Sequence, residues 1–173
     1  GDRFGFSIAL SHDGNTLATG AISEDSSSIG IDGDQTDNSM DNAGAVYVFA
    51  RNGKIWSQQA YVKASNTGGT EEGDQFGYDV ALNADGTTLT VSAITEDSAA
   101  TGINGNQNDD SAVDVGAVYV YTRNNETWNQ QAYLKPRQSP RETLVGSVLF
   151  GFAIGFSILQ GGGVRLIFLD KFY

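Results

Sequence analysis

Short apolar runs with partial alternation, separated by turns rich in glycine, asparagine and aspartate, dominate the chain. Phe4–Leu10 reads FGFSIAL, and Asp13-Gly14 connects it to a second apolar run, Thr16–Ala21. Alternation over about 4–8 residues is typical of a β-strand with one buried face. An Asp-Gly pair between two such runs is a strong hairpin signal. The pattern therefore predicts an antiparallel hairpin at the start of the chain.

The same pattern returns 72 residues later. Sliding the sequence by 72 positions aligns Gly1–Lys63 with Gly73–Lys135 without a gap, and 34 of the 63 aligned positions are identical. Phe76–Leu82 and Thr88–Ala93 repeat the two runs of the first hairpin. Self-similarity at a fixed long period indicates a stacked or circular array of equivalent units.

Each copy continues with a long polar loop and two more strands. The third and fourth strands are joined by Asn-Gly or Asn-Asn, which suits a tight hairpin turn. Four antiparallel strands in each copy predict an all-β fold built from β-propeller blades. A blade usually takes about 40–50 residues, and the 20-residue loop accounts for the longer period. The loops are 23–42 and 95–114; the later strands are Gly44–Phe49, Trp56–Lys63, Gly116–Tyr121 and Trp128–Lys135.

The order of motifs in residues 1–135 resembles the FG-GAP repeat of integrin α-subunit propellers and their bacterial relatives. The first copy has Phe4-Gly5, then D-G-x-T-L, then Gly20-Ala21 and the GAVYVF strand. The W-x-Q-Q-A-Y-L-K strand and the E-D-S loop further resemble a bacterial-type subgroup. The resemblance implies a β-propeller that is used outside the cell for adhesion or ligand binding.

Three positions depart from the family pattern. Ser92-Ala93 stands where the second copy should have Gly-Ala, and Ile22 and Ile94 replace the proline that follows. Many family members also carry a D-x-D-x-D-G calcium loop, which here is reduced to Asp13-Gly14 and Asp85-Gly86. Calcium takes about 6–8 oxygen ligands, so these turns are interpreted as structural.

Composition and charge narrow the function classes. The length of 173 residues suits one domain with a sizeable core, and the absence of cysteine excludes disulfides and thiolate-bound metals. Residues 1–134 hold 19 of the 21 acidic side chains but 5 of the 10 basic ones. Such a surface repels nucleic acid, so no nucleic-acid partner is expected. The chain begins at Gly1 without a methionine and is interpreted as a fragment or a processed piece.

The long loops hold the best candidates for binding. Both contain the pattern [DN]-G-[DN]-Q-x-D-[DN], in residues 32–38 and 104–110. Clustered oxygen donors on a glycine-bearing loop suit Ca²⁺, whereas Asp and Asn side chains also stabilise turns without any metal. Both interpretations stay open, and the second is favoured. The donors are Asp32, Asp34, Asp37 and Asn38, then Asn104, Asn106, Asp109 and Asp110.

No residue is assigned a catalytic role. Glu24-Asp25 and Glu96-Asp97 recur in register, but adjacent residues at a strand end point to opposite faces. Repetition also favours a structural role, because an active site is needed only once. His12 is the single histidine and has no counterpart in the second copy. The repeated Trp56, Trp128, Tyr61 and Tyr133 are expected to pack between blades rather than to stack on a ligand.

The register is lost after Lys135. Residues 136–142 read as a basic linker with two prolines, and residues 143–173 as an apolar tail. Residues 143–164 carry no charge and are long enough for a membrane helix, yet six of them are glycine. Phe150–Ile154 matches the head of the repeat. A degenerate third repeat, a membrane anchor and a sequence artefact therefore remain as alternatives.

We expect residues 1–72 and 73–135 to form two blades. Arrays need about three or more repeats, so further blades or self-association are expected partners, and a membrane only if 143–164 is an anchor. The expected function is non-enzymatic binding or adhesion outside the cell or at its surface, with a protein or glycan ligand contacting 23–42 and 95–114. The alternatives are a module that accompanies a hydrolase whose catalytic domain lies elsewhere, and a purely structural array.

Overall fold

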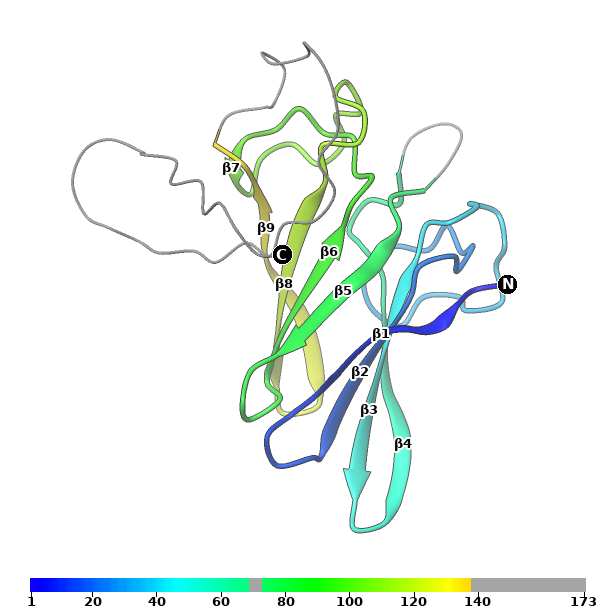
Figure 1. Cartoon of the computed structure of the whole chain (residues 1–173), viewed down its shortest axis with the longest axis vertical. Coiled ribbons are helices and arrows are strands. Elements are labelled where there is room, and N and C mark those ends of the chain that lie inside the picture. Colours follow the sequence, from blue (N-terminus) through cyan, green and yellow to red (C-terminus); the bar gives the residue numbers. More distant parts are fainter. Residues whose placement is uncertain (69–72, 138–173) are drawn as a thin grey trace, which may run out of the picture. The chain divides into compact units, whose positions relative to one another are not determined.

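The strands predicted from the sequence assemble into two antiparallel sheets (Figure 1). This computed structural model describes residues 1–68 and 73–137, all within one compact unit, Gly1–Thr143. The described residues form nine strands connected by turns and loops, and none of them is in a helix. The chain is therefore all-β, as its hydrophobic pattern predicts.

The two sheets have the same spatial order of strands, except that the second sheet has an additional short strand, β7, at one edge. We term the first sheet with its loops repeat 1 and the second sheet with its loops repeat 2. Repeat 1 is ordered β1-β2-β3-β4, and repeat 2 is ordered β5-β6-β8-β9-β7. The strands of repeat 1 are β1 (Phe4–Leu10), β2 (Thr16–Ala21), β3 (Ala45–Asn52) and β4 (Ile55–Val62). Those of repeat 2 are β5 (Phe76–Leu82), β6 (Thr88–Ala93), β7 (Gly102–Ile103), β8 (Ala117–Asn124) and β9 (Thr127–Lys135).

The predicted bounds agree with the structure for the first two strands of each copy and differ slightly for the others. Strands β3 and β8 extend to Asn52 and Asn124, up to the tight turns. The sequence does not predict β7, because two residues are too few to show a period. This short strand pairs with the outer edge of β9, and a single bridge between Ile31 and Val62 takes its place in repeat 1.

A bulge interrupts the β3–β4 pair and the β8–β9 pair at the same position. Val48 pairs with Ala60 while the next residue, Phe49, pairs with Gln58, which leaves Gln59 as an extra residue. Repeat 2 has the same shift, with Gln131 left over. A bulge bends the strand and re-aims a side chain, so the repeated Q-Q pair marks a defined irregularity of the sheet.

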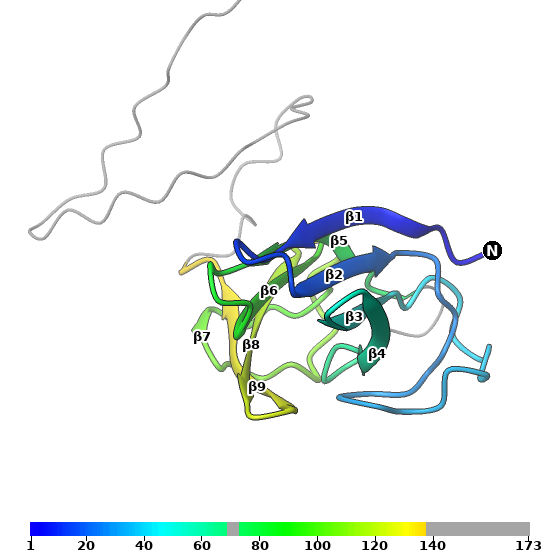
Figure 2. The ribbon, with the colours of Figure 1, turned by 90° about the horizontal axis from the view of Figure 1, so that it is seen from below.

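Repeat 2 packs against repeat 1, with β5 lying beside β1 and β2 (Figures 1 and 2). We term the surface of repeat 1 that meets repeat 2 its back face, and the surface of repeat 2 that meets repeat 1 its front face. Buried aliphatic side chains of one repeat meet buried aromatic side chains of the other in a shared core. The back face includes Val46, Val48, Ala60 and Val62, and the front face includes Phe76, Tyr119, Tyr121 and Trp128.

The connections fall at two opposite ends of the sheets. Both long loops lie at the upper end in Figure 1, and the Asp-Gly turns lie at the lower end with the β3–β4 and β8–β9 turns. In the described part of the chain, no helix has the length and apolar character to cross a membrane. The linker beyond Arg137 and the tail 143–173, with its apolar run 143–164, lie outside the described residues.

Candidate functional site

The glutamate of each E-D-S tripeptide forms a buried ion pair. Glu24 Oε2 lies 2.7 Å from Lys63 Nζ, and both side chains are almost fully buried. Glu96 and Lys135 form the same pair in repeat 2. Burying either charge alone is costly, so each lysine and glutamate depend on each other. The pair joins the start of the long loop to the end of the fourth strand in both repeats.

The aspartate and serine of the tripeptide clamp the rest of the loop. Asp25 Oδ1 accepts a hydrogen bond of 2.8 Å from the Asn42 N–H at the far end of the loop. The Ser26 hydroxyl donates to the carbonyl of Asp34, also at 2.8 Å. Repeat 2 has the same bonds, from the Asp114 N–H to Asp97 and from Ser98 to the carbonyl of Asn106. Glu24 and Asp25 thus have separate structural partners and form no acid–base pair.

The aspartates of loop 32–38 accept hydrogen bonds from the long loop and from the neighbouring strand β4. Asp32 has a φ of 56° and accepts a hydrogen bond of 2.9 Å from the Tyr61 N–H. Asp34 accepts from the N–H and hydroxyl of Thr36, and Asp37 accepts from the N–H and hydroxyl of Ser27. Loop 104–110 keeps the first of these contacts, because Asn104 Oδ1 accepts from the Tyr133 N–H at 2.9 Å.

These donors also set the charge state of the loop carboxylates. The hydroxyl and N–H of Thr36 lower the pKa of Asp34, and those of Ser27 lower the pKa of Asp37. Within residues 1–68 and 73–137, no group of three or more acidic or histidine side chains is placed to share a metal ion. The hydrogen bonds to Asp34 and Asp37 support the turn interpretation of loop 32–38.

The aspartates of the two Asp-Gly turns also accept local hydrogen bonds. Asp13 accepts hydrogen bonds from the Ser11 hydroxyl at 2.6 Å and from the Asn15 N–H at 3.0 Å. These bonds lower the pKa of Asp13 to about 2. Asp85 likewise accepts from the N–H of Thr87. Each aspartate therefore stabilises its own turn, in agreement with the structural interpretation.

Three of the four repeated aromatic residues lie in the core. Tyr61, Tyr133 and Trp128 are buried, and Trp128 Nε1 donates to Gln59 Oε1 of the other repeat at 3.1 Å. Packing between the repeats is thus confirmed for Trp128. Its counterpart Trp56 is exposed.

A buried polar cluster lies where repeat 2 meets repeat 1, and nothing in the sequence pattern predicts it. Asp74 is 1% exposed, and its burial and the nearby Glu96 carboxylate raise its pKa to about 8. Asn66 of repeat 1 donates to both carboxylates at 3.4 and 3.3 Å, and Tyr119 donates to Asn66 at 2.6 Å. The repeat alignment pairs Asp74 with Asp2, and only the structure shows that the first is buried and the second exposed.

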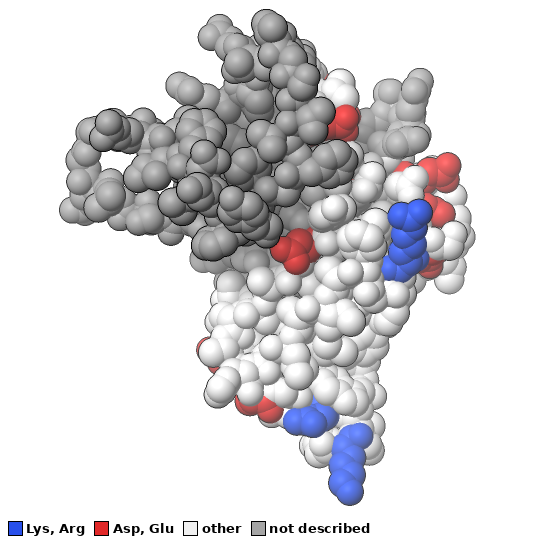
Figure 3. Space-filling model, in the orientation of Figure 1, with Lys and Arg blue, Asp and Glu red and all other residues white. Residues whose placement is uncertain are grey.

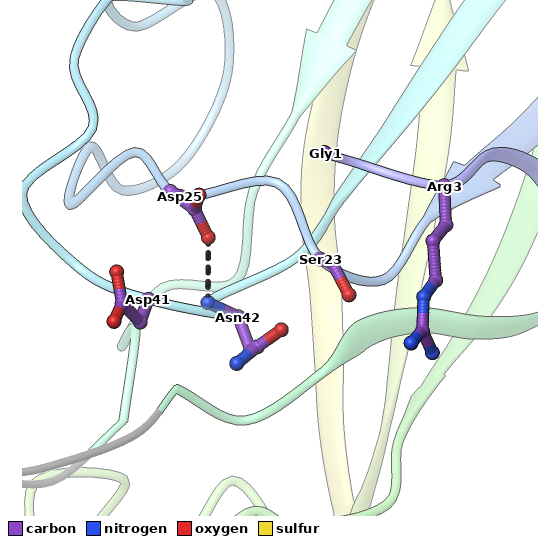
Figure 4. Close-up of a pocket in the computed structure, with 6 residues that line it drawn as sticks. All are labelled: Gly1, Arg3, Ser23, Asp25, Asp41 and Asn42. Carbon is purple, nitrogen blue, oxygen red and sulfur yellow. Dashed lines mark hydrogen bonds between the residues drawn. The ribbon is translucent and has the colours of Figure 1, made fainter.

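A shallow polar pocket of about 320 Å³ opens at the base of the first long loop (Figure 4). The Asp25 carboxylate already accepts the Asn42 N–H there, and the Arg3 side chain points away from Asp25 and Asp41. Figure 3 shows few charged side chains over the strands of the face in view, with charged residues gathered toward the two ends. The pocket is lined by Gly1, Arg3, Ser23, Asp25, Asp41 and Asn42.

A comparison with protein-family models finds no match, and a comparison with curated proteins finds no similar sequence.

Proposed function

We propose that this chain is part of an FG-GAP-like β-propeller that binds a protein or glycan ligand through its long loops, without enzymatic activity of its own. One observation carries the proposal: a fixed set of anchors holds loops whose exposed positions differ. The Glu–Lys pair, the aspartate clamp and the serine clamp are the same in both repeats. Rigid scaffolds that present variable loops are a common basis of recognition.

The differing positions are exposed and lie on one end of the sheets. Ile29 is 60% exposed where repeat 2 has Thr101, and Val113 is 75% exposed where repeat 1 has Asp41. Both loops project from the same end (Figure 1). An exposed apolar side chain on an otherwise polar loop gives a partner an anchor to bury. The resemblance to integrin-type propellers supports a location outside the cell or at its surface.

Substitutions of these exposed loop residues in the full chain test this proposal. The probes are a glycan array and a panel of immobilised extracellular-matrix proteins. We expect Ile29→Asp or Val113→Asp to weaken retention of a bound probe at least tenfold. The matched control is Ile55→Asp, which changes an equally exposed residue at the opposite end of the sheet and should leave binding unchanged. Absence of binding to every probe, or binding that only Ile55→Asp weakens, would contradict the proposal.

A further inference from the structure

The front face of repeat 1 is open, although the same face of repeat 2 is buried. In repeat 2 this face packs on the back face of repeat 1. The side chains at the corresponding positions of repeat 1 are apolar as well, so the difference lies in what covers them. Exposed fractions are 60% for Phe4 and 0% for Phe76, 66% for Ile8 and 6% for Val80, and 41% for Trp56 and 2% for Trp128.

The open face also keeps the polar geometry of the buried one. Arg51 lies over the ring of Trp56 at 5.5 Å, as Arg123 lies over Trp128 at 5.6 Å. In the buried junction, Arg123 and Trp128 both donate to the bulged Gln59 of the neighbouring repeat, at 2.9 and 3.1 Å. An apolar surface that carries these donors is complementary to a back face with a bulged glutamine. It is less suited to a smooth apolar partner.

Two positions on the back face of repeat 1 permit the close approach of repeat 2. Gly20 on β2 lies against the backbone of Gly77 on β5, where an added Cβ would overlap the Gly77 carbonyl oxygen. Ser7 on β1 donates its hydroxyl to the same oxygen at 2.8 Å. The neighbouring β-strands approach this closely only because one residue lacks a side chain and the other supplies a donor.

Repeat 2 has lost both features on its own back face. Ser92 replaces Gly20, and Asp79 replaces Ser7. The Ser92 Oγ accepts the Asp79 N–H at 2.9 Å, so these two residues contact each other. A third unit docked in the same geometry would meet the Ser92 Cβ with its backbone, and the Asp79 carboxylate would oppose its carbonyl oxygen. Other back-face positions, including Val118, Ala132 and Gln131, match those of repeat 1, and Leu134 stands where repeat 1 has Val62.

We infer that the front face of repeat 1 is a docking surface for the back face of another repeat of this kind, one that carries glycine at the Gly20 position and a hydroxyl at the Ser7 position. The occupant therefore comes from outside residues 73–135. A second copy of this chain is excluded as the occupant, because its free back face carries Ser92 and Asp79. This inference concerns assembly and is independent of what the long loops bind. Interfaces that join front to back extend in one direction.

The test gives the back face of repeat 2 the glycine and the hydroxyl that repeat 1 has at the Gly20 and Ser7 positions. In the full chain, Ser92→Gly combined with Asp79→Ser should allow one molecule to dock on the open face of the next. Sedimentation velocity over a concentration series measures this as a rise in weight-average mass of at least twofold. Adding Ile8→Asp to the open face should return the mass to that of the starting protein. The readout is the difference in weight-average mass with and without Ile8→Asp. Association through other surfaces of the chain cancels in this difference.

Wild-type protein with and without Ile8→Asp supplies the matched control, and no Ile8-dependent association is expected there. Ser92→Gly alone provides a second variant with a smaller rise, because Asp79 remains. Retained cooperative melting checks that each variant is folded. The inference is overturned if folded double and single variants show no Ile8-dependent association. It is equally overturned if the wild-type protein shows as much of it as the double variant.

Discussion

At the scale of single residues, the junction between the repeats gives the same amino acid two different environments. Asp2 and Asp74 occupy equivalent positions, but only Asp74 has a preceding repeat packed over it. Its carboxyl group is buried beside Glu96, with Asp97 and Asp110 nearby and Lys135 as the neighbouring cation. Burial and the negative neighbours favour the protonated form, which raises the pKa of Asp74 from 3.8 to about 8.

Asp74→Asn should therefore remove a pH dependence of stability. Below about pH 4 the Asp74 carboxyl group is protonated in both the folded and the unfolded chain, so it costs the fold no stability there. As the pH rises from about 4 to about 8, the group ionises in the unfolded chain but keeps its proton in the folded chain, and stability is lost. We expect the variant to be more stable than the wild-type protein at pH 8, by on the order of a few kcal/mol, and similar to it at pH 4. Urea denaturation at both pH values measures the difference.

The control for this prediction is Asp2→Asn, which makes the same change at the equivalent, exposed position. Comparison of variant with wild type also removes the opposite contribution of Asp13, whose pKa is lowered. Equal pH profiles for Asp74→Asn and the wild-type protein would show that Asp74 is ionised without cost in the folded state.

At the scale of strands, the two glutamines of the repeated Q-Q pair make different contacts because a bulge lies at this position. Gln58 donates to Gln35 of the long loop at 3.1 Å, and Gln130 donates to Gln107 in the same way at 3.4 Å. The following glutamine is the bulged residue, and in repeat 1 it accepts hydrogen bonds from Arg123 and Trp128 of repeat 2. The first glutamine therefore holds the loop, and the second joins the repeats.

Gln59→Ala is predicted to destabilise the chain by about 1–3 kcal/mol, because it leaves the buried Trp128 N–H and the Arg123 guanidinium without this acceptor. Gln131→Ala makes the same change at the exposed, equivalent position and should cost less than about 0.5 kcal/mol. Chemical denaturation followed by tryptophan fluorescence measures both. Equal effects of the two substitutions would mean that the bulged glutamine does not join the repeats.

The strands could be predicted from the sequence to within about three residues, because alternation and Asp-Gly turns are local signals. The bulges could not, because Gln59 looks like an ordinary member of the W-x-Q-Q-A-Y run until its pairing partner is known. The sequence also does not reveal which residues far apart in the chain contact each other. The pairing of Glu24 with Lys63 and the burial of Asp74 both depend on which segments meet.

The structural roles of the loop residues could be predicted in part from the repetition of the sequence. Repetition of Glu24-Asp25 and Glu96-Asp97 favoured structural roles, and each of the four side chains has its own structural partner. The choice between calcium and turns in loop 32–38 depended on where the donor oxygens point. Composition does not contain that information, whereas the hydrogen bonds to Asp34 and Asp37 do.

At the scale of the whole molecule, the repeats are equivalent in sequence order but not in their surfaces. Repeat 1 has a back face that accepts a neighbour and a front face that is open. Repeat 2 has a front face that is covered and a back face altered at Ser92 and Asp79. An array made of such units has a direction, and single substitutions at the faces determine which units become neighbours.

Gly20→Ser, which copies repeat 2 into repeat 1, is predicted to separate the two repeats. The new Cβ would overlap the Gly77 carbonyl oxygen. Because that oxygen belongs to the backbone of β5, the clash can be relieved only if the backbone of β2 or β5 moves. Overpacking of this kind costs about 1–3 kcal/mol, so the midpoint of urea denaturation should fall and dye binding to exposed apolar surface should rise. Ser92→Gly, the reverse change in repeat 2, should change the free energy of unfolding by less than about 1 kcal/mol. If Gly20→Ser left stability and dye binding unchanged, the repeats would not meet through the backbone contact between β2 and β5.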